Sequence, residues 1–147
     1  MLIFVTLILL VFAVLIFIHA RLLDRIDGDR KHAEETLRER EGKLRAIFDH
    51  ALDAIAIADD DGRYIDANPA ACELFGLPKE ELLGLKISDF TEPGFDFAQI
   101  WQFFRDKGQL SGEFRLHRLD GTVRDVEFKA TADFFPHHHL SILRDVT

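Results

Sequence analysis

Few side chains in this sequence commonly do chemistry in proteins. The one cysteine, Cys72, and the run His137–His139 are the candidates for a nucleophile or a metal ligand. We interpret Cys72 as a small buried thiol on a helix face, because free cysteines are among the most buried residue types. Three adjacent histidines point in different directions, which suits a single metal ion poorly. We therefore expect His137–His139 in a solvated loop before the last strand, with no resident metal.

Motifs for catalysis are absent from the sequence. It has no glycine-rich phosphate loop, no paired metal-binding motif and no serine–histidine pairing signal. The formal net charge is −8, from 18 Lys and Arg against 26 Asp and Glu. An acidic chain repels a phosphate backbone, so nucleic acid is not an expected partner. We expect a protein that is not itself an enzyme.

Aromatic side chains form a second group of candidates. Phe97, Trp101 and Phe104 recur at helical spacing within residues 95–106, on one face of an amphipathic helix. Such a stripe can line an apolar cavity between a helix and a sheet, where a small ligand would bind. It can equally fill that space, and we favour a filled core because aromatic stripes at this spacing usually serve packing.

The last residues of the chain form a third candidate, for signal coupling. Asp145 and Thr147 lie two positions apart, so in a strand their side chains share one face. There the carboxylate can accept a charge-assisted hydrogen bond, and Arg124 is the nearest candidate donor in the sequence; a basic residue beyond Thr147 is the other. We predict that Asp145, Thr147 and Arg124 couple the sheet to whatever follows. An ordinary exposed strand end is the alternative.

Turn residues and apolar runs outline the elements that would position these side chains. Asn68-Pro69 is typical of the N-cap and first residue of a helix, and Asp-Gly pairs mark two hairpin turns. The predicted strands are 54–58, 63–67, 110–117, 122–130 and 140–146, and the predicted helices are 69–75, 78–84 and 95–106. This order favours an α+β domain, with a five-stranded antiparallel sheet that carries its helices on one face.

Four stretches of this domain resemble signature stretches of the PAS family of sensor domains: 61–71, 74–76, 80–84 and 144–147. Together the resemblance covers residues 44–147. It implies a five-stranded antiparallel sheet, a surface for a small molecule or a protein, and a role in signal relay. Many members precede a histidine kinase or a nucleotide cyclase. Neither signature occurs in this sequence, so the resemblance implies an output domain missing from this chain, or a separate downstream protein.

The resemblance also bears on cofactors. Flavin-binding members carry a cysteine after the second short helix, but residues 83–90 contain none, and Cys72 lies one helix earlier. Haem-binding members usually ligate iron with a histidine on the long helix, and residues 95–106 contain none. We therefore predict no cofactor. A receptor for light, redox state or gas, with flavin, haem or a small apolar ligand, is the alternative.

Residues 1–20 have the composition of a membrane-spanning helix. Leu2–Ile18 is a run of seventeen residues without charge. It would form about 26 Å of helix, near the ~30 Å of a hydrocarbon core. A cleaved signal peptide is the alternative, but no Lys or Arg precedes the run, and bulky Ile18 lies where cleavage after Ala20 needs a small residue.

Basic residues set the expected orientation of this span. Six Lys or Arg follow it within about twenty residues and none precedes it. The positive-inside rule therefore predicts a single-pass protein of the cell inner membrane, with residues 46–147 in the cytoplasm.

Residues 21–45 have the pattern of a weak coiled coil. Apolar residues occupy six of eight heptad core positions when position a is set at residues 26, 33, 40 and 47, and arginines occupy the other two. We predict a homodimer stem, because membrane-tethered helices have a high local concentration for pairing. A solvated single helix is the alternative. The predicted contact residues are Leu23, Ile26, Leu37 and Leu44.

Overall fold

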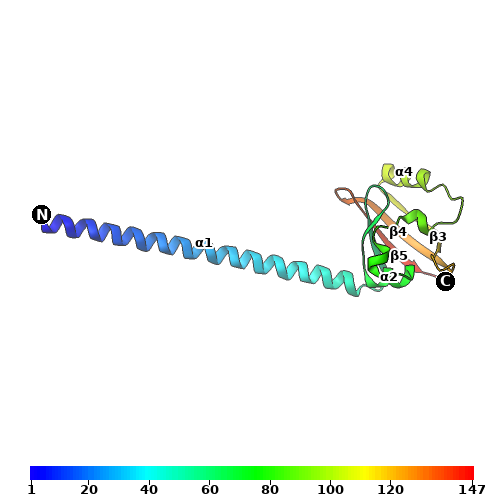
Figure 1. Cartoon of the computed structure of the whole chain (residues 1–147). Coiled ribbons are helices and arrows are strands. Elements are labelled where there is room, and N and C mark those ends of the chain that lie inside the picture. Colours follow the sequence, from blue (N-terminus) through cyan, green and yellow to red (C-terminus); the bar gives the residue numbers. More distant parts are fainter. The chain divides into compact units, whose positions relative to one another are not determined.

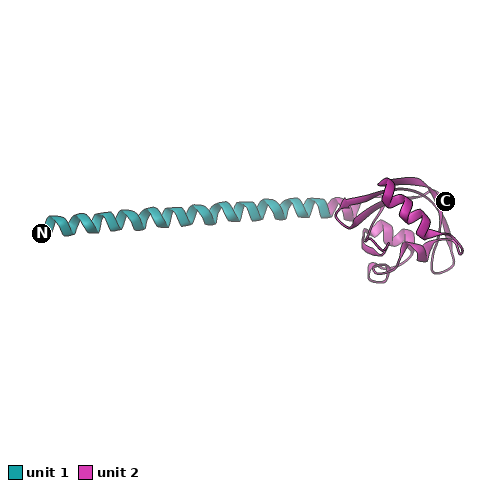
Figure 2. Cartoon of the chain, turned by 90° about the horizontal axis from the view of Figure 1, so that it is seen from above, with its two compact units in different colours: residues 1–45 teal, residues 46–147 magenta.

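The computed structural model describes residues 1–147, which form two compact units, 1–45 and 46–147 (Figure 2). A single helix, α1, runs without a break from Leu2 to His50, so that it forms the first unit after Met1 and its last turn belongs to the second (Figure 1). Its 49 residues correspond to about 73 Å of helix. The predicted span and the predicted stem are therefore parts of one continuous element.

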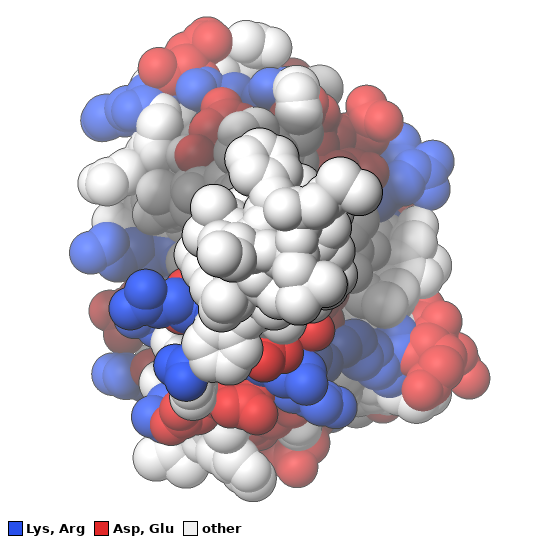
Figure 3. Space-filling model, turned by 90° about the vertical axis from the view of Figure 1, so that its left-hand side faces the viewer, with Lys and Arg blue, Asp and Glu red and all other residues white.

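The N-terminal part of α1 is uniformly apolar. An 18-residue window reaches a mean hydropathy of 3.1, and none of it is buried within the chain. Seen from this end, the nearest atoms carry no Lys, Arg, Asp or Glu colouring (Figure 3). The hydroxyl of Thr6 donates to the carbonyls of Leu2 and Ile3, so it needs no other partner in an apolar medium. By length and composition α1 can cross a membrane, a property that a signal sequence would share.

The following part of α1 is polar and exposed. Ion pairs one helical turn apart join Arg30 to Glu34 at 3.0 Å and Lys43 to Glu39 at 2.7 Å. Such pairs each stabilise an exposed helix by about 0.3–0.5 kcal/mol. The predicted contact residues of the stem are all exposed along this helix: Leu23, Ile26, Leu37 and Leu44.

The second unit is built on a five-stranded sheet with the order β2-β1-β5-β4-β3, in which every neighbouring pair is antiparallel. The strands are β1 Ala54–Ala58, β2 Tyr64–Ala67, β3 Gln109–His117, β4 Val123–Phe135 and β5 His138–Asp145. Apart from the last turn of α1, all helices of this unit lie between β2 and β3 in the sequence (Figure 1). The predicted α+β fold is confirmed, with the last strand at the centre of the sheet.

Strands β4 and β5 depart from the prediction. Strand β4 continues to Phe135 rather than ending at Ala130, and β5 begins at His138. Phe135 pairs with His138, and His137 takes a left-handed φ of 62° between them. The expected solvated loop at His137–His139 is therefore wrong for two of its three residues. The polar side chains of the histidines suggested a loop, but their backbone forms a tight hairpin. Pairing with the neighbouring strand, and not side-chain polarity, decides where this strand starts.

Helix α2, Pro69–Phe75, begins and ends where the sequence predicts. The side chain of Asn68 accepts a hydrogen bond from the backbone N–H of Ala71, as an N-cap does. Gly76 ends the helix with a left-handed φ of 73°, and its N–H donates to the carbonyl of Cys72 at 2.9 Å. The thiol of Cys72 is half-buried, and burial raises its pKa.

Two short helices and one longer helix follow. Helix α3 spans Lys79–Leu82, and the 3-10 helix η1, which the sequence did not predict, spans Ile87–Phe90. Helix α4 spans Phe97–Lys107, close to the predicted 95–106. It begins two residues later than predicted, because the side chain of Asp96 accepts from the N–H of Gln99 as the N-cap.

The core lies between the sheet and these helices. Its centre is a group of three aromatic rings, from Tyr64, Phe75 and Phe90, with centroids 4.7–6.1 Å apart. Burial raises the pKa of the Tyr64 hydroxyl. The buried positions of β1 are all alanine, which lets α2 approach the sheet closely: Ala54, Ala56 and Ala58.

Candidate functional site

The predicted aromatic stripe of α4 packs against the chain itself. The Trp101 ring stacks on Phe97 and tilts against Phe104, with centroid distances of 5.4 Å in both pairs. Its indole N–H donates to the backbone carbonyl of Asp60 at 2.9 Å. Gly62 lies under Phe97, where an added Cβ would come within 3.3 Å of the ring. The stripe therefore holds α4 against the turn between β1 and β2.

Beside this stripe, the carboxylate of Asp60 interacts with nitrogen atoms of three side chains. It lies 2.6 Å from Nδ1 of His137, 3.0 Å from Nε2 of His139 and 3.0 Å from a guanidinium nitrogen of Arg105. The hydrogen bonds from the two histidines hold the pKa of Asp60 below its usual range. We call these four residues the Asp60 cluster. Sequence reasoning missed it, because its members come from a turn, a helix and a hairpin.

The tautomer of His139 follows from its two partners. Its Nδ1 accepts a hydrogen bond from the backbone N–H of Asp133 at 3.1 Å, so in the neutral ring the proton sits on Nε2 and points at Asp60. The side chain is only 1% exposed and contacts the Trp101 ring edge-on. This histidine therefore joins the hairpin to the β1–β2 turn within the core.

The same geometry argues against a metal ion here. Donor atoms of Asp60, Asp133 and His139 lie within 4.8 Å of one another. A metal-bound imidazole nitrogen needs a free lone pair, and the other ring nitrogen then carries the proton as a donor. In His139, a metal on Nε2 would place a proton on Nδ1 against the N–H of Asp133, and a metal on Nδ1 would displace that N–H from its acceptor. The cluster suits structural cross-linking better than metal binding.

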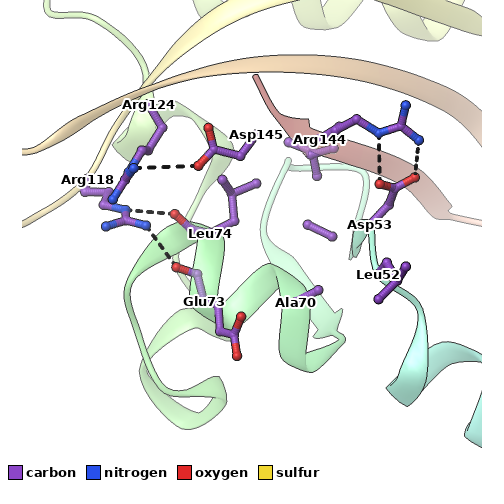
Figure 4. A pocket seen from close by; sticks show the side chains of 11 residues that line it. Leu52, Asp53, Ala70, Glu73, Leu74, Arg118, Arg124, Arg144 and Asp145 are labelled. Carbon is purple, nitrogen blue, oxygen red and sulfur yellow. Dashed lines mark hydrogen bonds and ion pairs between the residues drawn. The ribbon is translucent and has the colours of Figure 1, made fainter. Parts of the chain in front are cut away.

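A second group of polar residues lies at the other end of β1 and β5 (Figure 4). We call it the junction, because it joins the residues that follow α1 to the last strand. Its members are Asp53, Asn68, Arg124, Arg144, Asp145 and Thr147.

Asn68 is the buried member of the junction, with no exposed surface. Its amide nitrogen donates to the carbonyls of Phe48 at 3.1 Å and Asp53 at 3.0 Å. Its amide oxygen accepts from the N–H groups of Ile55 and Ala71, both at 2.9 Å. One side chain thus joins the last turn of α1, the start of β1 and the start of α2. The sequence revealed only the last of these roles.

Asp53 and Arg144 form a bidentate ion pair across the junction (Figure 4). Nε and Nη2 of the arginine lie 3.0 and 2.8 Å from the two carboxylate oxygens. This arrangement matches the planar fork of a guanidinium to a carboxylate. It holds the pKa of Asp53 below its usual range and raises the pKa of Arg144. Neither residue was predicted as a site residue, because 91 positions separate them.

The three predicted coupling residues lie together. Arg124 lies 3.8 Å from Asp145, an ion pair too long for a hydrogen bond. The hydroxyl and the N–H of Thr147 donate to Asp145 at 2.5 and 3.0 Å, and these bonds mainly hold the pKa of Asp145 below its usual range. The Thr147 hydroxyl oxygen also accepts from the N–H of Asp125. The strand end is thereby fastened to β4, while the role in coupling stays a prediction.

Comparisons with known proteins identify relatives of this chain. A family model described as PAS domain matches residues 42–109. Sporulation kinase E of Bacillus subtilis is 32% identical over 122 residues, which are 82% of this chain and 16% of that protein. This chain therefore spans less than a fifth of that kinase's length.

Two solved structures are similar in both sequence and fold. A domain of a sensory box sensor histidine kinase/response regulator from Geobacter sulfurreducens is 32% identical, with a TM-score of 0.63, over 74% of this chain and 96% of that one. The PAS domain of a protein from Colwellia psychrerythraea is 30% identical, with a TM-score of 0.61, over 71% and 96%.

Proposed function

Because this chain belongs to the PAS domain family, we propose that it is a membrane-anchored cytoplasmic module that senses a signal, dimerises and passes the signal on. The junction carries this proposal. The residues that follow α1 and the end of β5 are joined there by Asp53–Arg144, and Asn68 fixes the carbonyl of Phe48 to the same place. A change that reaches the domain through α1 would act directly on the strand that leaves it.

Transmission through the junction would use its exposed charges. Buried Asn68 keeps the end of α1 in register with β1 and α2. The exposed pair Asp53–Arg144 and the neighbouring pair Arg124–Asp145 can exchange partners at little cost, because exposed ion pairs contribute only ~0–1 kcal/mol. Small shifts of packed elements are a common way to switch a downstream domain.

The membrane anchor is supported by the apolar window of α1 and by the basic residues that follow it. A reporter fused after Thr147 should be active in the cytoplasm of a Gram-negative host and inactive outside it. Activity of a periplasmic reporter in that position would contradict both the orientation and the assumed compartment.

The dimer is supported by the heptad pattern of α1. Leu37 and Leu44 are exposed d positions of that pattern, one heptad apart. The paired substitution of both leucines by Asp should lower self-association of the chain in detergent micelles. Unchanged sedimentation would place the dimer contact elsewhere.

A histidine kinase or a nucleotide cyclase is the output that we propose. The relatives include a sporulation kinase and a domain of a sensor histidine kinase. We propose that the domain works without a bound cofactor, since residues 83–90 contain no cysteine and α4 no histidine. A purified protein with no absorption beyond ~320 nm would agree with this, and a visible spectrum would favour the light, redox or gas receptor.

A charge swap at the junction tests the proposed function. In a fusion of the chain to a histidine kinase, Asp53→Arg and Arg144→Asp should each lock or abolish regulation, because each places like charges together. The double swap restores opposite charges and should restore regulation. Equal signalling by all three variants and the parent would mean that the junction does not carry the signal.

A further inference from the structure

A cavity of about 380 Å³ opens at the junction, beside α2 (Figure 4). Three arginines from the sheet side line it: Arg118, Arg124 and Arg144. The volume falls within the range of about 300–1,000 Å³ that small-molecule sites occupy. The question is which of these cations has hydrogen-bonding capacity left for a ligand.

Two of the arginines are already engaged. Arg144 gives Nε and Nη2 to Asp53. Arg118 gives Nε to the carbonyl of Leu74 at 2.8 Å and Nη2 to the carbonyl of Glu73 at 2.9 Å, at the C-terminal end of α2. Both side chains therefore hold the wall of the cavity in place.

Arg124 is different. Its Nε is buried and has no hydrogen-bond partner, and its Nη1 lies 3.8 Å from Asp145. The carboxylate of Asp145 accepts its short hydrogen bonds from Thr147 instead. A buried donor without an acceptor is unfavourable. Because Nε is enclosed by the chain, the Nη atoms of Arg124 are the donors that a ligand in the cavity can reach.

The rest of the lining is mixed. Asp53, Glu73 and Asp145 contribute carboxylates, and Ala54, Leu74 and Leu143 are nearly fully buried beneath the cavity. Leu52, which is 97% exposed, is the apolar residue that a ligand can cover, and covering it is favourable. A ligand that uses both Arg124 and Leu52 has one anionic head and a short hydrocarbon body.

We propose that this cavity binds a small organic acid, with its carboxylate on Arg124 and its short apolar chain against Leu52. The planar guanidinium matches the geometry of a carboxylate. Arg118, Arg144 and Asp53 form the fixed part of the cavity wall, because their side chains are already hydrogen-bonded within the chain. Binding at this place is independent of the proposed signalling role and can be measured without it.

Sodium butyrate is the probe, added to the full chain in detergent micelles near neutral pH at constant ionic strength. The Nε–Hε resonance of Arg124, assigned by its loss in Arg124→Lys, should shift saturably with butyrate. Butyramide, which has the same body without the charge, should cause no such shift. Arg124→Lys should weaken binding, followed by ligand-observed NMR, at least about fivefold, because lysine lacks the planar fork.

Arg115→Lys is the matched control, since Arg115 lies on the same sheet, 74% exposed, and pairs with Asp125 at 3.6 Å. It should change butyrate binding by less than about twofold. No saturable shift with butyrate, an equal shift with butyramide, or unchanged binding to Arg124→Lys would each overturn the proposal. Equal binding of inorganic phosphate would show a site for charge alone and overturn the assignment of an organic acid.

Discussion

Two aspartates flank β1, and each binds a residue of β5, yet the two ends behave differently. Asp53 precedes β1 and pairs with Arg144, whose side chain is 63% exposed. Asp60 follows β1 and binds His139, which is 1% exposed. An exposed ion pair can exchange partners, whereas a buried hydrogen bond is costly to leave unmade. The Asp60 cluster fixes the sheet at one end, and the junction leaves its charged pairs free to change at the other.

Both ends belong to one antiparallel ladder. Ala54 pairs with Leu143 near the junction, and Ala58 pairs with His139 near the Asp60 cluster. A shift of β5 by one residue would turn its side chains to the opposite face and break both contacts. The cluster therefore defines the register that the junction depends on.

The largest effect should come from Asn68, the one buried member of the junction. Asn68→Ala removes four hydrogen bonds, which join this side chain to backbone groups of Phe48, Asp53, Ile55 and Ala71. We expect the free energy of unfolding to fall by about 3 kcal/mol or more, measured by urea denaturation in micelles. Asn68→Ser keeps a side chain that can cap α2 and should lose less. A loss below ~1 kcal/mol for the alanine variant would mean that Asn68 does not hold the end of α1, β1 and α2 together.

His139 should come next. His139→Ala removes a buried ring and its bonds to Asp60 and Asp133, and we expect a loss of about 2–4 kcal/mol in the same assay. His138→Ala, at a neighbouring and less buried position, is the control and should lose clearly less. Equal losses would show that the Asp60 cluster does not fix this end of the sheet.

Acid should weaken the Asp60 cluster in a defined direction. Because hydrogen bonds from His137 and His139 hold the folded-state pKa of Asp60 below 3.8, the carboxylate stabilises the fold above that pH. This contribution is lost as pH falls through the lower, folded pKa. Asp60→Asn should therefore flatten the fall in stability on acidification below about pH 4.

The neighbouring exposed residue Asp61 supplies the control for that experiment, as Asp61→Asn. The test is a series of urea midpoints at decreasing pH. If Asp61→Asn flattens the acid limb as much as Asp60→Asn, the interaction with the histidines is not its cause.

The smallest effect on stability should come from Asp145. Its carboxylate is about 40% exposed, so Asp145→Ala should change the free energy of unfolding by only ~0–1 kcal/mol. Signalling of a kinase fusion should nevertheless be lost or locked, since Asp145 holds Thr147 beside β4. A variant that signals like the parent would show that this motif is only a strand end.

Local patterns explain which parts of the fold could be predicted. The boundaries of α2 follow from Asn68, Pro69 and Gly76, whose preferences act within a few residues. The predicted start of β5, at residue 140, is wrong. His138 and His139 are polar, and they belong to the strand only because their backbone pairs with β1 and β4.

In the junction, too, some residues could be predicted from local patterns and others could not. Arg124, Asp145 and Thr147 could be grouped from a strand pattern and a nearby turn. The pair Asp53–Arg144 could not, because its partners are 91 residues apart and the pairing of β1 with β5 is needed to bring them together. No local signal marks such a contact, since the two residue types are common on any surface.

The central place of β5 has a consequence for how such modules can be rearranged. Ala54 and Leu143 are partners in the ladder, so the chain arrives at the sheet and leaves it at neighbouring points. A domain with its two ends close together can be removed, duplicated or replaced by another without stretching the flanking segments. Exchange at residues 53 and 146 should therefore give chimaeras in which one helix receives a different sensor while the distance to the next segment stays the same.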